Sequence, residues 1–456
     1  MNQQPLLISN HSKTIKLHVE QMVIYLQSKI IEATDDLHNI YYLFFYKEHF
    51  LTYVKPTKLK RRTHIEKAFT KGIILPSTHP LIHSLLSSDH PYKKRTFNQL
   101  IKKAESSYSP QEVAQIATFF ESFISKKTIF SLIQSIFYDY RRNGQMFSSY
   151  RILRILMDFT PNHSWVKGLS SDLNFIKYGK LYDQLSDELM TKDPIYMEKA
   201  LYTDKSYNQL IQLLQNQSRW MDEIALYIHH ISPNNYLSLK PLLNNHFTDE
   251  EIMDVLEHLS EHTDDVSEMY DDLLENYLHH QNAEKMINLL FTHKLTLNPK
   301  QTQEFEHLLE NVELEPEQFP TEKVLSFLVP LFNINPEKAT KLLHKFIVLQ
   351  LKEYDIDSVV KRLIPLKNVM HAHPILEKLQ HIQKLANDPD QQLLLGELYY
   401  EFQQFDQAID CFSWEMELKS IDPKPVKWLS KIYNEIGMEQ EHRAYRQLYI
   451  DMQKRA

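Results

Sequence analysis

Glycine is scarce in this chain of 456 residues. It occurs six times, whereas an average usage of about 7% predicts about 32. No two glycines lie closer than eleven positions. This spacing excludes a dinucleotide-binding fingerprint and a phosphate-binding Walker A loop, which both need closely spaced glycines. Because tight β-hairpins also favour glycine, the scarcity predicts that the chain is neither a β-sandwich nor a β-barrel.

Cysteine and long apolar runs are also lacking. Cys411 is the only cysteine, which excludes an intrachain disulfide and a zinc site built from several thiolates. The first residues lack the basic segment and apolar run of a signal peptide. The most apolar stretch, 41–54, contains Lys47, Glu48 and His49, so it is too short and too polar to span a membrane. We therefore expect a cytoplasmic protein without a membrane span.

Helical periodicity dominates what the sequence does contain. Residues 17–31 place apolar side chains at the three- and four-residue spacing of one buried helical face. From 166 to 385, runs of 10–15 residues alternate with short breakers such as Asn335-Pro336, where proline opens the next helix. Such helices bury their apolar faces by stacking as antiparallel pairs. The sequence predicts an all-α fold, an α-solenoid of helix pairs.

The C-terminal residues carry a more specific pattern. Leu395-Gly396, Tyr399, Ala408 and Phe412 have the spacing Leu-Gly-x2-Tyr-x8-Ala-x3-Phe. This pattern resembles the tetratricopeptide repeat (TPR), a 34-residue helix-turn-helix unit. Counting from the glycine gives one unit at 389–422 and a second at 423–456. The second unit keeps Leu429, Ser430, Tyr433 and Gly437 in phase and departs from the family pattern at His442 and Arg446.

We predict three parts on this basis. Residues 1–165 form a basic N-terminal helical domain, and residues 166–385 form a degenerate helical-repeat region. Residues 386–456 form the C-terminal TPR pair, so the superhelix is TPR-like with degenerate repeats upstream of that pair.

Charge is distributed unevenly, although the net charge is only −8. Between Lys55 and Lys103 there are twelve Lys and Arg against Glu66 and Asp89. The segment 241–284 holds thirteen acidic residues and no Lys or Arg. These segments are either solvated helix faces or surfaces for partners of opposite charge. The candidate basic patch is Lys58, Lys60, Arg61, Arg62, Lys93, Lys94 and Arg95.

The TPR resemblance also implies a set of contact residues. In the family, the first helix of each unit lines a concave groove. The matching positions include Tyr400 in the first unit and Lys424, Lys427, Lys431 and Asn434 in the second. Three lysines at i, i+3 and i+7 share one helical face. The resemblance implies that this face grips carboxylates of a peptide; the other interpretation is an ordinary exposed lysine face.

One catalytic motif needs consideration. His258-Leu-Ser-Glu261-His262 matches H-x-x-E-H, the inverted zinc-protease signature. The surrounding region is acidic and polar, and the sequence identifies no third ligand, so a solvent-facing helix is the default interpretation. We expect no metal and no cofactor.

The sequence thus leads to three hypotheses. The first is a non-catalytic TPR-like scaffold or adaptor that binds a protein or peptide partner, possibly acidic, in its groove. The second is a TPR-type regulatory receptor whose basic N-terminal region contacts nucleic acid or a regulator. The third and most remote is a zinc metallohydrolase that uses the His258, Glu261 and His262 motif.

Overall fold

A computed structural model describes residues 6–10, 13–86, 91–263, 266–311, 321–386, 388–419 and 421–455. The chain divides into two compact units, Met1–Tyr270 and Asp271–Ala456. We describe each unit by itself. The boundaries predicted at residues 165 and 385 stay predictions.

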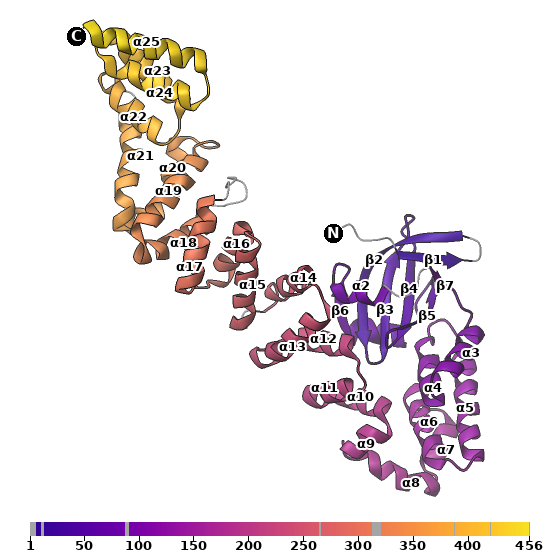
Figure 1. The fold of residues 1–456 in the computed structure, drawn as a ribbon. Helices are drawn as coiled ribbons and strands as arrows, with labels where there is room; N and C mark the ends of the chain where they lie inside the picture. Colours follow the sequence, from indigo (N-terminus) through magenta and orange to yellow (C-terminus); the bar gives the residue numbers. More distant parts are fainter. Residues whose placement is uncertain are drawn as a thin grey trace. The chain divides into compact units, whose positions relative to one another are not determined.

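The first unit opens with a seven-stranded sheet (Figure 1). The strands are β1 (Leu6–Asn10), β2 (Lys13–Tyr25), β3 (Ser28–Thr34), β4 (Ile40–Tyr46), β5 (His49–Val54), β6 (Ile73–Pro76) and β7 (Tyr92–Lys93). Their order is β5-β4-β3-β2-β1-β7, and β6 pairs with β2 as well. The rings of Phe50 in β5 and Tyr92 in β7 lie 4.6 Å apart. The two ends of the sheet therefore approach each other, and the sheet is a nearly closed barrel.

The all-α prediction is consequently wrong for the N-terminal residues, although the rest of the chain is largely helical. The apolar pattern of 17–31, which we assigned to one helix, belongs to the hairpin of β2 and β3. The register of this pair shifts between Val19 and Gln21. Such a bulge changes the phase of a two-residue alternation, so the apolar positions coincide with helical spacing. The many β-branched residues, among them Ile30 and Ile31, favour strands.

The glycine argument against a barrel fails at the turns. Leu26, His38 and Lys47 adopt the left-handed backbone conformation, with φ of 52°, 58° and 54°. Each lies in the connection between two successive strands, where glycine is the usual residue. Local hydrogen bonds offset the steric cost: the Lys47 amide donates to the Gln27 carbonyl at 2.7 Å, and the Asp35 side chain accepts from the Asn39 amide at 2.9 Å.

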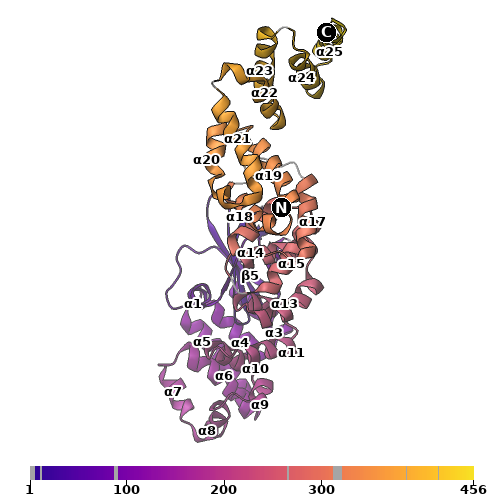
Figure 2. The same ribbon diagram turned by 90° about the vertical axis from the view of Figure 1, so that its left-hand side faces the viewer.

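Helices make up the rest of the first unit. They are α1 (His64–Lys71), α2 (Pro80–Leu86), α3 (Phe97–Ser107), α4 (Pro110–Phe119), α5 (Lys126–Arg142), α6 (Met146–Phe159), α7 (Ser164–Ser170), α8 (Leu173–Gly179), α9 (Asp187–Lys192), α10 (Pro194–Thr203), α11 (Tyr207–Asn216), α12 (Trp220–His229), α13 (Pro233–His246) and α14 (Asp249–Ser260). A short 3-10 helix, η1 (Lys180–Tyr182), follows α8. The bundle of α4, α5 and α6 lies below the sheet in both views (Figures 1 and 2).

A buried ion network joins the sheet to α10 and α12. The Lys29 ammonium in β3 lies 2.7 Å from the Asp222 carboxylate. Arg219, at the start of α12, pairs with Glu198 and with Asp222 and donates to the Leu26 carbonyl at 3.0 Å. All four charged side chains are at most 4% exposed. Two cations and two anions thus neutralise each other away from water.

The electrostatics favour the ionised forms of Asp222 and Arg219, whereas burial lowers the pKa of the Lys29 ammonium. Burial opposes ionisation of Asp222, but the attraction of Arg219 and Lys29 outweighs it and lowers the pKa of this carboxyl. Burial acts on Arg219 in the opposite sense, and the attraction of Asp222 and Glu198 raises the guanidinium pKa above its usual value.

Gly72 gives a first testable prediction. It ends α1 against β2, and a Cβ there would lie 2.6 Å from the Ala68 carbonyl oxygen and 2.7 Å from that of Ile24. Because both neighbours are backbone atoms, the chain must shift. We expect Gly72→Ala to lower the free energy of unfolding by about 1–3 kcal/mol, measured by urea denaturation.

The matched control is Gly168→Ala. Apart from adjacent residues and the backbone of its own helix, no atom lies within 4 Å of a Cβ at this helical glycine. The substitution should therefore stabilise the first unit by about 0.5–1 kcal/mol. Equal effects of the two substitutions would contradict the close packing at Gly72.

The second unit is helical wherever the structure describes regular elements. The helix α15 (Ser267–His279) crosses the boundary between the units. It is followed by α16 (Ala283–His293), α17 (Pro299–Asn311), α18 (Thr321–Ile334), α19 (Pro336–Gln350), α20 (Ile356–Arg362), α21 (His373–Leu385), α22 (Gln392–Glu401), α23 (Phe405–Leu418), α24 (Pro423–Glu435) and α25 (Glu439–Arg455). Short 3-10 helices η2 (Ile364–Asn368), η3 (Met370–Ala372) and η4 (Pro389–Gln391) lie between them.

Among the described residues of both units, no helix combines the length and the apolar character needed to cross a membrane.

Candidate functional site

The last four helices form two consecutive helical hairpins, α22 with α23 and α24 with α25 (Figure 1). Their common core is fully buried at Ala408, Phe412, Leu429 and Ile432. The turn inside the second hairpin contains Gly437, whose φ of 79° is a left-handed conformation that favours glycine. The helix α25 continues through His442, whose ring nitrogen Nδ1 lies 2.8 Å from the Ser430 carbonyl oxygen.

Close packing inside the first hairpin depends on Gly396. A Cβ at this position would lie 2.8 Å from a ring carbon of Phe412. Real Cβ atoms do not approach so closely, so the absence of a side chain at Gly396 lets α22 approach the aromatic ring of α23. The glycine and Phe412 of the sequence pattern thus contact each other directly.

The first helices of the two hairpins, α22 and α24, share a cluster of aromatic and charged side chains. The Lys431 ammonium lies 4.4 Å from the Tyr400 ring centroid and 5.0 Å from that of Trp428. The Trp428 indole donates to the Glu397 carboxylate at 3.1 Å, and the Tyr400 hydroxyl donates to Glu435. We call the surface made by Tyr400, Trp428, Lys424, Lys427 and Lys431 the α22–α24 face.

Two kinds of interaction hold this cluster in place. Trp428 stacks on the buried Phe412 ring with a centroid distance of 5.7 Å and an interplanar angle of 1°. A cation above an aromatic face gains roughly 0.5–1 kcal/mol at an exposed site, so Lys431 is partly held by its own chain. Partial burial and the hydrogen bond to Glu435 raise the pKa of Tyr400, which keeps its hydroxyl as a hydrogen-bond donor.

Of the contact residues predicted from the sequence, Tyr400 lies in α22 and the other four lie in α24. Lys424, Lys427, Lys431 and Asn434 are all exposed. The structure brings Lys431 into contact with Tyr400, whereas Lys424 and Lys427 have no ion pair within the described ranges.

Sequence reasoning missed Trp428, which lies outside the family's groove positions. Its place between Lys427 and Lys431 on the same helix is the signal that would have indicated it.

A pocket of about 430 Å³ lies elsewhere in the second unit. Apolar, acidic, amide and tyrosine side chains line it: Leu351, Tyr354, Asp355, Ile356, Asp357, Ile382, Gln383, Ala386, Tyr399, Gln404 and Gln407. Its Asp357 carboxylate accepts a hydrogen bond from Gln383 at 2.6 Å. Hydrogen bonds from Ser358 lower the pKa of Asp355, so the pocket wall carries negative charge at neutral pH.

The predicted basic patch lies in the first unit, on the connection between β5 and α1, at Lys93 of β7 and on the connection between β7 and α3. Six of its seven side chains are exposed: Lys58, Lys60, Arg61, Arg62, Lys93 and Lys94. Arg95 differs, because its guanidinium donates to the Leu51 carbonyl at 2.5 Å and stands over the Phe50 ring. Arg95 therefore fixes the β7–α3 connection to the sheet.

The acidic segment occupies α14, α15 and the neighbouring residues. Its Asp264 and Asp265 lie outside the described residues. Glu251 completes a capping box with Thr248 at the start of α14, so at least one of these carboxylates has a local structural role.

The H-x-x-E-H motif lies at the end of α14, and its histidines contact each other. The His258 and His262 rings are 4.9 Å apart, and the buried His79 ring lies 6.4 Å from His258. Glu261 and His262 are exposed. Within the part of the chain that the structure describes, no three His, Cys, Asp or Glu side chains are arranged to hold a metal ion.

Comparison of the chain with protein-family models gave no match, and comparison with curated proteins gave none either.

Proposed function

We propose that this chain is a non-catalytic helical scaffold of the TPR type, which binds an acidic segment of a partner protein on the α22–α24 face. The observation that carries the proposal is the exposure of Lys424, Lys427 and Lys431 on one side of α24, beside Tyr400 of α22. Cations at i, i+3 and i+7 offer carboxylates spaced along a peptide a row of charge-assisted hydrogen bonds.

The neighbouring contacts support the same assignment. Trp428 is stacked on the core and Tyr400 is hydrogen-bonded to Glu435, so both rings are held before a partner arrives. A preorganised face lowers the entropic cost of binding. The two hairpins, with Gly396 packed on Phe412, are the arrangement expected of TPR units.

A charge-reversal variant tests this function. We expect the triple substitution Lys424→Glu, Lys427→Glu and Lys431→Glu to abolish capture of a discrete partner by the purified full-length chain. With about 1 kcal/mol lost for each charge-assisted contact, the affinity should fall about 100-fold, measured by calorimetry once the partner is purified.

The control reverses three exposed lysines elsewhere in the second unit, Lys361→Glu, Lys367→Glu and Lys384→Glu. The net charge then changes equally in both variants. If both variants keep the same partner, or if both lose it equally, the proposal for the α22–α24 face is wrong.

The regulatory-receptor hypothesis retains support as a second candidate. It requires a basic surface in the first unit, and the two basic segments there are tied to neighbouring strands and helices by hydrogen bonds.

A further inference from the structure

Six exposed cations of the first unit come from two segments that are distant in sequence. Lys58, Lys60, Arg61 and Arg62 lie between β5 and α1, and Lys93 and Lys94 lie at β7. We call these six residues the basic surface.

Hydrogen bonds bring the two segments together. The Thr52 hydroxyl in β5 donates to the Arg95 carbonyl at 3.0 Å and accepts from the Arg95 amide at 2.9 Å. This pair holds the residues after β7 against β5, whose end leads directly into the other basic segment. The Lys60 amide in that segment donates to the Ser122 hydroxyl at 2.9 Å. The backbone that carries the cations is therefore fixed while their side chains stay in solvent.

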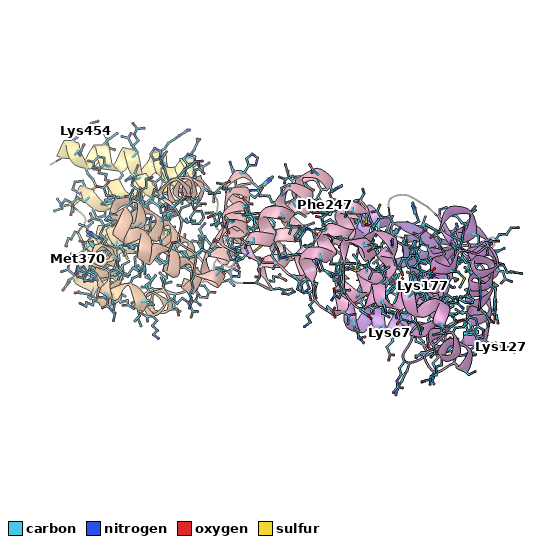
Figure 3. All side chains as sticks on the ribbon, turned by 90° about the horizontal axis from the view of Figure 1, so that it is seen from below. Lys67, Lys127, Lys177, Phe247, Met370 and Lys454 are labelled. Carbon is cyan, nitrogen blue, oxygen red and sulfur yellow. The ribbon has the colours of Figure 1, made fainter. Side chains whose placement is uncertain are left out.

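The positive charge of the basic surface is only partly compensated by its own chain. None of its six side chains forms an ion pair within the described ranges. The Glu66 carboxylate lies at the basic surface and accepts a hydrogen bond from the Arg62 amide, so it offsets part of the positive charge. Glu112 accepts from Lys47 at 2.9 Å, and the buried Glu121 lies 3.8 Å from Lys126. Lys67 and Lys127, also exposed, add positive charge on the same unit (Figure 3).

The side chains around the basic surface indicate which kind of polyanion it can bind. Among the described residues from 41 to 126, no Phe, Tyr or Trp side chain is exposed. Proteins that hold single strands stack bases on exposed aromatic rings, and such rings are lacking here. Proteins that bind lipid surfaces combine cations with exposed apolar side chains. In the same described range, Ile74 is the one exposed large apolar residue.

We propose that the basic surface binds the phosphate backbone of a double-stranded nucleic acid without reading its sequence. Flexible lysine and arginine side chains neutralise phosphates and release condensed counterions, which is the sequence-independent mode of binding. This function is independent of peptide binding on the α22–α24 face.

Fluorescence anisotropy of the full-length chain with a labelled 20-base-pair DNA duplex tests the proposal. If the six cations each neutralise about one phosphate, the affinity should fall about 2,000-fold between 50 and 200 mM salt. In the triple variant Lys58→Ala, Lys60→Ala and Arg61→Ala, the fall over the same range should be only about 40-fold, because about half of the counterions are released. Its affinity at 50 mM salt should be at least about 10-fold lower.

The matched control removes three other exposed lysines of the first unit, Lys167→Ala, Lys177→Ala and Lys180→Ala. Its salt dependence should equal that of the unchanged chain. The proposal is overturned if this control weakens binding as much as the triple variant does. Tighter binding of the matching single strand, or binding of phosphatidylserine vesicles without binding of the duplex, also overturns it.

A second variant covers the case in which the first one fails to fold, as judged by circular dichroism. Lys93→Ala with Lys94→Ala changes the other segment and should reduce the salt dependence by about two counterions. If this variant folds and binds the duplex as the unchanged chain does, the basic surface is not the binding site.

Discussion

Arg219→Met should destabilise the first unit by about 3–5 kcal/mol, because it leaves two buried carboxylates with one cation. In the structure, Arg219 pairs with both Glu198 and Asp222, whereas Lys29 pairs with Asp222 and donates to the Lys47 carbonyl at 2.9 Å. Removal of the guanidinium leaves the Glu198 carboxylate without a cation, with Gln27 as its remaining hydrogen-bond donor at 2.6 Å. The same substitution also removes the donor to the Leu26 carbonyl at the β2–β3 turn.

The measurement is urea unfolding followed by far-ultraviolet circular dichroism. The control is Arg142→Met, which breaks an ion pair with Asp139 whose partners are 72% and 63% exposed. Exposed pairs contribute about 0–1 kcal/mol, so this control should behave almost like the unchanged chain. A loss below about 1 kcal/mol for Arg219→Met would show that the network contributes little to the stability of the first unit.

Lowering the pH from 7 to 5 should decrease the free energy of unfolding of the first unit, because two buried histidines resist protonation. Burial, followed by the nearby charge of Lys67, lowers the pKa of His64 to about 3. Burial, followed by the charges of His258 and His83, lowers the pKa of His79 to about 3. Both histidines stay neutral in the folded chain and become protonated in the unfolded chain below about pH 6.5.

The number of protons bound by each state determines how the free energy of unfolding changes with pH. Below pH 6.5 the unfolded state binds more protons, so the free energy of unfolding falls with pH until the folded-state pKa near 3 is reached. Between pH 7 and pH 5 each histidine should cost about 2 kcal/mol, and the two together should cost about 4 kcal/mol. Urea unfolding at several pH values measures this slope.

Two single substitutions test whether His79 contributes to the loss of stability between pH 7 and pH 5. His79→Asn keeps a side-chain acceptor for the Leu81 amide, which now donates to His79 Nδ1 at 3.2 Å, and it should halve the loss. The exposed His38→Asn should leave the loss unchanged, since asparagine tolerates the left-handed backbone of that turn. An unchanged slope in His79→Asn would exclude His79 as its source.

The helical part of the fold was predictable because its signals are local. Proline at the first turn and capping side chains indicate helix starts, and the structure begins α4 at Pro110 and α19 at Pro336. The sheet was not predictable in this way. Its hairpins use Leu26, His38 and Lys47 in place of glycine, and the bulge in β2 imitates helical spacing.

The candidate sites also differ in whether local sequence signals predict them. The lysine row of α24 follows from helical periodicity and could be read from the sequence. The approach of Lys93 and Lys94 to the β5–α1 connection depends on closure of the sheet, which has no local signature. The pairing of Lys29 with Asp222 spans 193 positions, and neither residue lies in a pattern that indicates the other.

The long sequence separation of Lys29 and Asp222 affects how the chain can fold during its synthesis. Lys29 is made early, but its carboxylate partner leaves the ribosome only after 193 further residues. Until then the ammonium stays in water, because an unpaired charge is costly to bury. We therefore expect the nascent sheet to stay incompletely packed until α10 and α12 have been synthesised, with its strand edges open during that time to pairing with other chains. A fragment that ends before Asp222 should remain permanently in that state.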